Sequence, residues 1–242
     1  MAGSANQLFE GDTALVTGAA NGIGRGIAEA LAREGVRVLR ADLKGSDLDV
    51  DLSKPGEAKR LAAEAIKRLG KVSIFVHSAS PRRKEEDTAL EVSEDTWRAM
   101  QEVNLNAGFL LGQALGRHMR EHKIRGRMLY ITSLHAYSPR NLPHYSAAKA
   151  GQTMLVREFA RALGPDGIRV NAIAPGAIPG GGFDASKNPG LLDTIPMGRF
   201  GTPADIAAMA LAVLSERFGA YVTGATIAVD GGIAQHNWID RR

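Results

Sequence analysis

Short apolar segments alternate with longer amphipathic segments along almost the whole chain. The apolar segments are rich in valine, isoleucine and leucine, which is typical of strands buried on both faces of a parallel sheet. The pattern predicts strands at residues 13–17, 37–40, 72–76, 128–132, 170–174 and 225–229, with a further short strand ending near residue 51.

Helices are predicted between these strands, at residues 23–33, 55–69, 93–121, 145–163 and 202–214. Pro55 suits the first turn of the second helix, and Ser93 and Thr202 suit the N-cap positions of two others. Residues 43–50 are too short and too interrupted by glycine for a full helix. The alternation predicts one α/β domain over residues 1–242, a Rossmann-type doubly wound parallel sheet of about seven strands with helices on both faces.

Residues 176–200 break this alternation, because they contain three consecutive glycines, several prolines and few apolar runs. A loop of this length inside a compact domain is usually either disordered or functional. The segment directly follows a predicted strand, at the end of the sheet where open α/β folds bind ligands. We therefore expect a substrate lid at about residues 177–200.

A glycine-rich turn, Thr17-Gly-Ala-Ala-Asn-Gly-Ile-Gly24, joins the first predicted strand to the first predicted helix. Gly18 permits the tight turn, Gly22 lets the backbone approach a pyrophosphate, and Gly24 allows close packing of the helix. The helix N-terminus then offers N–H groups and a positive dipole end to the phosphates. The turn therefore predicts a dinucleotide site.

Asp42 lies at the end of the second predicted strand, 18 residues after Gly24. A carboxylate at this place accepts hydrogen bonds from both ribose hydroxyls of NAD and repels the 2′-phosphate of NADP. Asn21, where an arginine would hold that phosphate, agrees with this interpretation. Lys44 and Arg40 keep NADP open as the less favoured cofactor, so NAD is the prediction.

Tyr145 and Lys149 are four residues apart on the predicted helix 145–163, and Ser133 lies twelve residues before the tyrosine. Residues with a spacing of four lie on one face of a helix, about 6 Å apart along its axis. A lysine cation beside a phenol favours the ionised form, which suits Tyr145 to exchange a proton with an alcohol or carbonyl oxygen. Together, this pair and the glycine turn predict a hydride-transferring enzyme.

Several motifs follow one another along nearly the whole chain: Thr17-Gly-Ala-Ala-Asn-Gly-Ile-Gly24, Asp51, Asn104 within Val-Asn-Leu-Asn-Ala-Gly-Phe, Ser133, Tyr145-x-x-x-Lys149 and Asn171-Ala-Ile-Ala-Pro-Gly176. In these motifs and their order the chain resembles the short-chain dehydrogenase/reductase family, in its single-domain branch. The resemblance implies that Tyr145 is the general acid/base and that Ser133 hydrogen-bonds the substrate oxygen. It also implies that Lys149 binds the nicotinamide ribose and that Asn104 holds a water linking Lys149 to solvent.

The expected cofactor site extends from the glycine turn to the residues that follow the later strands. Asp51 and Leu52 are expected to bracket the adenine. The candidate cofactor-binding residues are Gly18, Asn21, Gly22, Ile23, Gly24, Asp42, Asp51, Leu52, Ala79, Tyr145, Lys149, Pro175, Gly176 and Ile178.

Two positions depart from the pattern of the family that the chain resembles. That family usually has Asn-Asn-Ala-Gly after the fourth strand, where this chain has His77-Ser78-Ala79-Ser80. We expect a buried, hydrogen-bonded His77 rather than a second catalytic base. Gly180 stands where the family often has a threonine that holds the carboxamide, so that contact is expected from backbone or from the region of Ile178.

The candidate substrate residues are Ser133, His135, Arg140 and Tyr145, with Pro81, Arg82, Leu134, His144 and Ala177 also expected in the pocket. His135 and Arg140 make the pocket polar and cationic, which suits a hydroxylated or anionic substrate. Residues 133–136 with 139–149, together with residues 195–201 and 230–232, are similar to those of sugar-oxidising members such as the glucose 1-dehydrogenases. We therefore expect a sugar, a polyol or a related secondary alcohol. The alternatives are an NADPH-dependent 3-oxoacyl-thioester reductase and a non-catalytic NAD-binding sensor.

Composition narrows the remaining classes of protein. The 30 lysines and arginines give a net charge of +4 but are spread along the chain, so no nucleic-acid partner is expected. The absence of cysteine excludes disulfides and thiolate catalysis, and we predict no metal site. We find no apolar run near the ~20 residues that span a bilayer and no leader pattern, so a cytoplasmic protein without a membrane partner is expected.

Apolar residues extend beyond one face of the predicted helices near residues 97–109 and 154–163. Such surface is commonly buried between subunits. Members of the family that the chain resembles are often homotetramers built through these helices, so a homotetramer is expected. Trp238 is expected to pack in this contact or to reach a neighbouring active site.

Overall fold

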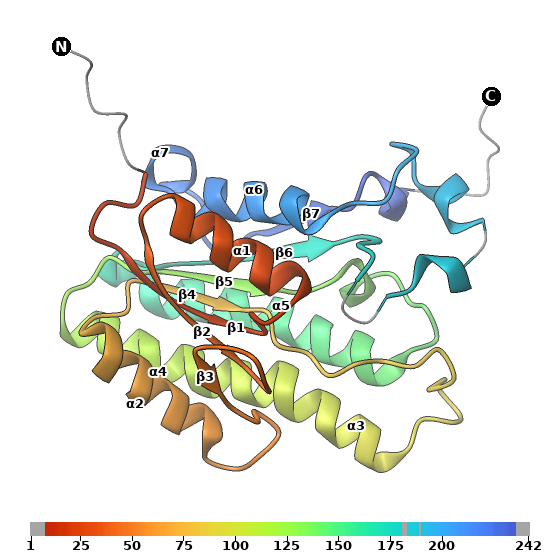
Figure 1. Cartoon of the computed structure of the whole chain (residues 1–242), viewed down its shortest axis with the longest axis horizontal. Coiled ribbons are helices and arrows are strands. Elements are labelled where there is room, and N and C mark those ends of the chain that lie inside the picture. The colour runs from red at the N-terminus through yellow and green to blue at the C-terminus, as the bar shows by residue number, and fades with distance from the viewer. Residues whose placement is uncertain (1–7, 181–182, 189, 236–242) are drawn as a thin grey trace.

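The computed structural model describes residues 8–180, 183–188 and 190–235, so Gly181, Gly182 and Trp238 lie outside the described residues. The described chain forms a sheet of seven parallel strands in the order β3-β2-β1-β4-β5-β6-β7 (Figure 1). The strands are β1 (Thr13–Thr17), β2 (Arg37–Asp42), β3 (Leu48–Asp49), β4 (Ile74–His77), β5 (Arg127–Ile131), β6 (Arg169–Pro175) and β7 (Thr226–Val229).

The strand order reverses beside β1. That strand pairs with β2 on one side and with β4 on the other, so the chain winds outward in both directions from this point. In open α/β sheets, a crevice forms beyond the carboxyl ends of the strands at such a switch point. The fold therefore locates a ligand crevice beyond the ends of β1 and β4.

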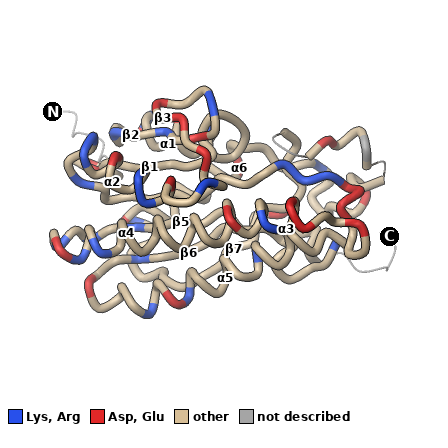
Figure 2. Tube along the Cα trace, turned by 90° about the horizontal axis from the view of Figure 1, so that it is seen from below, with Lys and Arg blue, Asp and Glu red and all other residues tan. Residues whose placement is uncertain are grey.

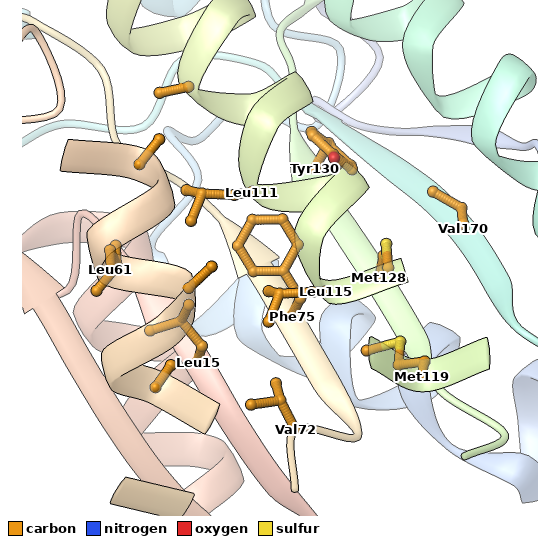
Figure 3. Close-up of a cluster of buried hydrophobic side chains, with 14 of the residues drawn as sticks. Leu15, Leu61, Val72, Phe75, Leu111, Leu115, Met119, Met128, Tyr130 and Val170 are labelled. Atoms are coloured by element: carbon orange, nitrogen blue, oxygen red, sulfur yellow. The ribbon is translucent and has the colours of Figure 1, made fainter. Parts of the chain in front are cut away.

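Helices cover both faces of the sheet, as Figure 1 shows. On one face, α1 and α6 enclose a core with Val16, Ile74 and Ile173 of the strands. On the other face, α2, α4 and α5 enclose a larger core around Phe75 and Tyr130 (Figure 3). The main helices are α1 (Gly22–Arg33), α2 (Glu57–Leu69), α3 (Glu94–Gln101), α4 (Ala107–Glu121), α5 (Pro143–Leu163), α6 (Pro203–Leu214) and α7 (Glu216–Gly219).

The predicted fold class is confirmed, and every predicted strand lies within two residues of an observed one. The second helix starts at Glu57 instead of Pro55, because Gly56 before it takes a left-handed φ of 83°. Thr202 caps α6 through a capping box with Asp205, as its position predicts. No helix in the described part of the chain is long and apolar enough to cross a membrane.

The long helix predicted for residues 93–121 is interrupted. Ser93 caps α3 by accepting a hydrogen bond from the backbone of Thr96, as predicted. A π-helical turn, Glu102–Asn106, then separates α3 from α4. A helical turn with one extra residue is typical of functional sites. This π-helical turn contains Asn104, whose carbonyl oxygen contacts His77 at the end of β4.

The segment after β6 has little regular structure. Two short 3-10 turns, Ala185–Lys187 and Leu191–Thr194, follow a local bridge between Gly180 and Phe183. Phe183 stacks edge-on near Phe200, with 6.1 Å between the ring centres. The segment therefore folds against itself above the carboxyl ends of the strands.

Candidate active site

A cavity of about 1250 Å³ lies beyond the carboxyl ends of the strands. It is lined by the turn after β1, the ends of β2, β4, β5 and β6, the first turns of α5 and the segment after β6. All the residues predicted to bind cofactor line this cavity, and so do Ser133, His135, Arg140 and Tyr145. Its volume exceeds the ~300–1,000 Å³ of ordinary small-molecule sites, which suits a dinucleotide and a second ligand together.

The glycine turn forms one wall, where two glycines are sterically required. Gly18 has a φ of 67°, and a Cβ on it would lie 2.7 Å from the backbone nitrogen of Ala79. A Cβ on Gly24 would lie 2.1 Å from the carbonyl oxygen of Gly18. Thr17 fixes the facing loop, because its hydroxyl oxygen accepts hydrogen bonds from the backbone N–H groups of Ser78 and Ala79. The turn is thus held open as a backbone cradle.

The first turn of α1 is free to receive an anion. Its N-cap residue, Asn21, makes no side-chain capping hydrogen bond, and no acidic residue lies in the first turn. The N-terminal N–H groups of a helix and its positive dipole end favour a phosphate in such a place. A pyrophosphate group therefore fits this wall in both shape and charge.

Asp42 projects from the end of β2 toward the same cavity. Its two carboxylate oxygens accept hydrogen bonds from the backbone N–H groups of Ala20, at 2.8 Å, and Leu43, at 2.7 Å. These contacts orient the carboxylate while leaving lone pairs for ribose hydroxyls. Lys44 also lines the cavity, whereas Arg40 pairs with Asp47 at 2.7 Å and lies outside the lining.

Asp51 and Leu52 form the adjoining wall, beyond β3. The Asp51 carboxylate accepts hydrogen bonds from both the backbone N–H and the hydroxyl of Ser53. The Ser53 hydrogen bonds lower the pKa of Asp51, so this carboxyl group is an acceptor at neutral pH. Beside it, the buried Leu52 side chain offers an apolar surface to a flat ring.

Tyr145 and Lys149 come from the first two turns of α5 and line the cavity together. The Lys149 ammonium lies 5.6 Å from the centre of the Tyr145 ring and donates a hydrogen bond to the carbonyl of Ile131 at 2.8 Å. Burial, reinforced by the nearby Arg83 charge, lowers the pKa of Lys149 to about 7. Met100 and Leu142 pack with Tyr145 in a small apolar cluster that fixes its ring.

Ser133 caps the short turn that follows β5. Its hydroxyl oxygen accepts a hydrogen bond from the backbone N–H of His135 at 3.1 Å, so the hydroxyl proton is directed elsewhere. The residue is buried yet lines the cavity with Tyr145. A hydroxyl donor and a phenol therefore share one wall.

Asn104 is fully buried in the π-helical turn and is absent from the described cavity lining. Its carbonyl oxygen accepts hydrogen bonds from Gln152, at 2.7 Å, and from His77, at 3.2 Å. Its side-chain amide donates to the carbonyl of Met100. The contacts thus join the π-helical turn to both β4 and α5, and the water-holding role of Asn104 stays a prediction.

His77 is buried and hydrogen-bonded at both ring nitrogens, which confirms the expectation for this position. Its Nε2 faces the carbonyls of Val103 and Asn104, which only accept, so Nε2 carries the proton. Its Nδ1 then accepts from the Thr17 hydroxyl at 3.0 Å. Burial and the Lys149 charge lower the pKa of His77 to about 4, so the ring is neutral at physiological pH.

The far end of the cavity is built by loops. His135 donates from Nδ1 to the carbonyl of Ser138 at 3.0 Å, which leaves Nε2 as an acceptor. Arg140 pairs with Glu85 at 3.1 Å and donates to Asn188 at 2.7 Å. It thereby ties the segment after β4 to the segment after β6. His144 is buried and does not line the cavity in the described chain.

Arg83 also lines this end, although sequence reasoning singled out only its neighbour Arg82. Its guanidinium carbon lies 4.7 Å from the centre of the Tyr145 ring. The sequence feature that could have indicated Arg83 is the run of three basic residues, 82–84, which follows a strand end that faces a ligand site.

Known proteins resemble this chain over almost all of its length. A family model described as enoyl-(acyl carrier protein) reductase matches residues 18–234. The chain is 35% identical to glucose 1-dehydrogenase 2 of Bacillus subtilis, covering 92% of this chain and 95% of that protein. It is also 35% identical to 2-dehydro-3-deoxy-D-gluconate 5-dehydrogenase of the same organism, covering 96% of each.

A similar solved structure comes from Beutenbergia cavernae, from a protein assigned provisionally as an NAD(P)-dependent gluconate 5-dehydrogenase and solved with NADP bound at low occupancy. The two chains are 31% identical and superpose with a TM-score of 0.86. The match covers 95% of this chain and 99% of the other.

Proposed function

Because the chain belongs to the short-chain dehydrogenase/reductase family, we propose that it oxidises a secondary alcohol of a sugar, polyol or sugar acid with NAD, or reduces the matching ketone. The observation that carries this proposal is that one cavity joins the glycine cradle to Ser133, Tyr145 and Lys149. A protein that only bound nucleotide has no need of the last three side chains.

The residues present fit a nicotinamide dinucleotide. The cradle at Gly18 and Gly24 would hold the pyrophosphate, and Asp42 the adenosine ribose. Pro175, Gly176 and Ile178 would flank the nicotinamide end. When bound, the nicotinamide accepts a hydride from an alcohol or donates one to a ketone.

Within the protein, the proton is handled by Tyr145. In the oxidation direction, the Tyr145 oxygen would take the proton from the substrate hydroxyl while a hydride leaves the carbon that bears this hydroxyl, so that a carbonyl group forms. The Ser133 hydroxyl donates a hydrogen bond to the substrate oxygen and orients it. Lys149, buried beside the ring and lining the same cavity, would hold a cofactor ribose hydroxyl.

The preference for NAD rests on Asp42. Backbone hydrogen bonds hold its carboxylate in the cavity, and a 2′-phosphate at this place would meet like charge. Arg40, one of the two cations that could offset that repulsion, is engaged by Asp47. Lys44 is the remaining cation of this wall among the described residues.

We place this enzyme in the cytoplasm as a homotetramer. Its chain contains no cysteine, which suits a reducing compartment. Trp97, Phe109 and Met154 are large apolar side chains exposed on α3, α4 and α5. Phe109 stacks on Phe159, with 5.9 Å between the ring centres, which extends an apolar surface suited to a subunit contact.

The test is a screen that follows nicotinamide absorbance with NAD or NADP against sugars, polyols, sugar acids and 3-oxoacyl thioesters. We expect turnover with NAD and a hydroxylated substrate. Turnover confined to NADPH and acyl thioesters would assign the alternative reductase activity. Nucleotide binding by calorimetry without turnover of any compound would assign a sensor and contradict the proposal.

A further inference from the structure

A segment of opposite charges follows β4 and passes over the cavity. Residues 82–84 are basic and residues 85–87 are acidic, and Figure 2 shows this change of sign in the segment before α3. Arg82 and Arg83 line the cavity, whereas Lys84 does not. The segment therefore directs two of its three cations inward.

Arg83 reaches the reacting end of the cavity. Its side chain is half-buried, and its guanidinium lies over the Tyr145 ring at 4.7 Å. Burial is the largest cause that lowers the pKa of Lys149, His135 and His144. The positive charge of Arg83 lowers the pKa of each of the three further. The positive potential of Arg83 is thus felt where Tyr145 would exchange its proton.

The two arginines at this end differ in their partners. Arg140 is neutralised by Glu85 and further held by Asn188. Arg83 takes part in none of the ion pairs between described residues, and its Nε is shielded from solvent with no hydrogen-bond partner. A shielded guanidinium N–H without an acceptor is costly, and an anionic ligand would satisfy it.

Acidic residues in the described lining of the cavity are confined to the cofactor end, where Asp42 and Asp51 lie. The opposite end carries Arg82 and Arg83, together with Arg140, whose charge Glu85 neutralises. No carboxylate of the described lining is therefore placed to neutralise Arg83. This separation of charge favours a ligand that brings its own negative charge to the Tyr145 end.

We propose that Arg83 binds the carboxylate of the substrate, so that the enzyme acts on hydroxy acids of the sugar-acid class in preference to neutral sugars and polyols. The planar guanidinium matches a carboxylate with two parallel hydrogen bonds. His135 Nε2 accepts a hydrogen bond from a hydroxyl of the same molecule. This inference rests on the proposed function and names the substrate class of that site.

The experiment compares hexonates with the hexitols of the same configuration, for example gluconate with sorbitol, at saturating NAD. Each pair differs only in having a carboxylate in place of a terminal hydroxymethyl group. We expect kcat/KM for the best hexonate to exceed that of its hexitol by roughly tenfold or more. Arg83→Gln is expected to raise KM for that hexonate by roughly tenfold or more and to bring the acid-to-alditol ratio close to one.

Two variants serve as controls. Lys84→Gln removes the same charge from the same segment but outside the cavity, and it should leave both kcat/KM values unchanged. Arg83→Lys keeps the charge without the planar fork and should recover part of the preference. The melting temperature of each variant, and its KM for NAD, separate a binding defect from a folding defect.

The outcomes distinguish this inference from the proposed function. The carboxylate assignment is wrong if kcat/KM for hexitols or neutral aldoses equals that for hexonates. It is also wrong if Arg83→Gln lowers kcat/KM equally for both members of a pair. In either case the proposed dehydrogenase activity still stands. If the wild-type protein oxidises no member of the panel, the proposed function fails, and the inference fails with it.

Discussion

The two ends of the cavity are built in different ways. The cofactor end is made of backbone: glycines that admit no Cβ, the first turn of α1, and a carboxylate held by two main-chain N–H groups. The proposed substrate end is made of side chains from connecting segments: Arg83 and Arg140 lie outside helices and strands, and His135 lies in the short 3-10 turn Leu134–Ala136. Tyr145 and Lys149, on α5, lie between the two ends.

The difference shows which properties of the site follow from the backbone fold and which depend on the side chains of this particular sequence. Backbone geometry at a strand-to-helix turn follows from the fold, and it determines which cofactor skeleton can bind. Loop side chains can change without disturbing the sheet, so they determine which alcohol is accepted. Substitutions at the cofactor end are therefore expected to change kcat/KM equally for every substrate. Substitutions at the substrate end are expected to change kcat/KM for some substrates more than for others.

The largest expected effect outside the catalytic residues is at Gly24. In Gly24→Ala, the new Cβ would lie 2.1 Å from the Gly18 carbonyl oxygen, so the cradle has to shift. Because overpacking of this kind costs ~1–3 kcal/mol, we expect NADH to bind roughly 100-fold more weakly, measured by calorimetry. The kcat/KM values of all substrates should fall by a common factor.

Gly164→Ala is the control, because the residue lies outside the described cavity lining and a Cβ there meets nothing within 4 Å apart from its chain neighbours. It should leave NADH affinity unchanged. Equal affinity of wild type and Gly24→Ala would show that the glycine turn does not hold the nucleotide.

A smaller effect is expected at Asp42. Asp42→Asn keeps an oxygen for the N–H of Ala20 but removes the charge that opposes a 2′-phosphate. We expect the ratio of kcat/KM for NAD to that for NADP to fall by roughly tenfold, since a charge pair near a protein surface contributes ~1–4 kcal/mol. Asp49→Asn removes a charge from the paired position of β3, outside the cavity lining, and should leave the ratio unchanged. An unaltered ratio in Asp42→Asn would contradict the assignment of NAD.

The smallest effect concerns His77, which is buried between Thr17 and the π-helical turn. Its pKa is lowered to about 4 in the folded chain, against 6.5 for an ordinary histidine. Between these values the unfolded chain binds a proton that the folded chain does not, so stability is full above about pH 6.5 and falls as the pH drops toward 4. The contribution of His77 falls by about 1 kcal/mol from about pH 6.5 to about pH 5.5.

His77→Asn removes this titration. Urea unfolding across the same pH range should show a shallower loss of stability in the variant than in the wild type, whatever the offset at neutral pH. Parallel pH profiles would mean that His77 is not held neutral by its surroundings.

The geometry of the proposed cofactor end could be predicted from the sequence, because the residues that form it are local in the chain. Gly18, Gly24 and Asp42 each act through a turn or strand end that the apolar pattern locates within two residues. The same holds for Tyr145 and Lys149, whose spacing on a helix brings them to one face. At these positions the apolar pattern locates the turn or helix, and the residue types within it indicate the chemistry.

The substrate end could not be predicted in the same way. Whether Arg82, Arg83 or Lys84 faces the cavity depends on the path of a loop without periodicity, and the sequence gives no period to follow there. Arg140 was expected to meet substrate, yet its charge is engaged by Glu85, 55 residues away. The π-helical turn at Asn104 was also missed, because no proline interrupts residues 93–121 to mark a break in the helix.

The proposed role of Tyr145 in proton exchange is tested by measuring NADH binding and alcohol turnover on the same preparation of Tyr145→Phe. This change removes one oxygen atom and leaves the packing of the ring against Met100 and Leu142 in place. We predict that NADH affinity stays within about threefold of wild type while turnover falls by roughly a thousandfold, since a positioned general acid/base contributes ~10²–10⁴. Turnover at the wild-type rate in this variant would show that Tyr145 is not the group that exchanges the proton.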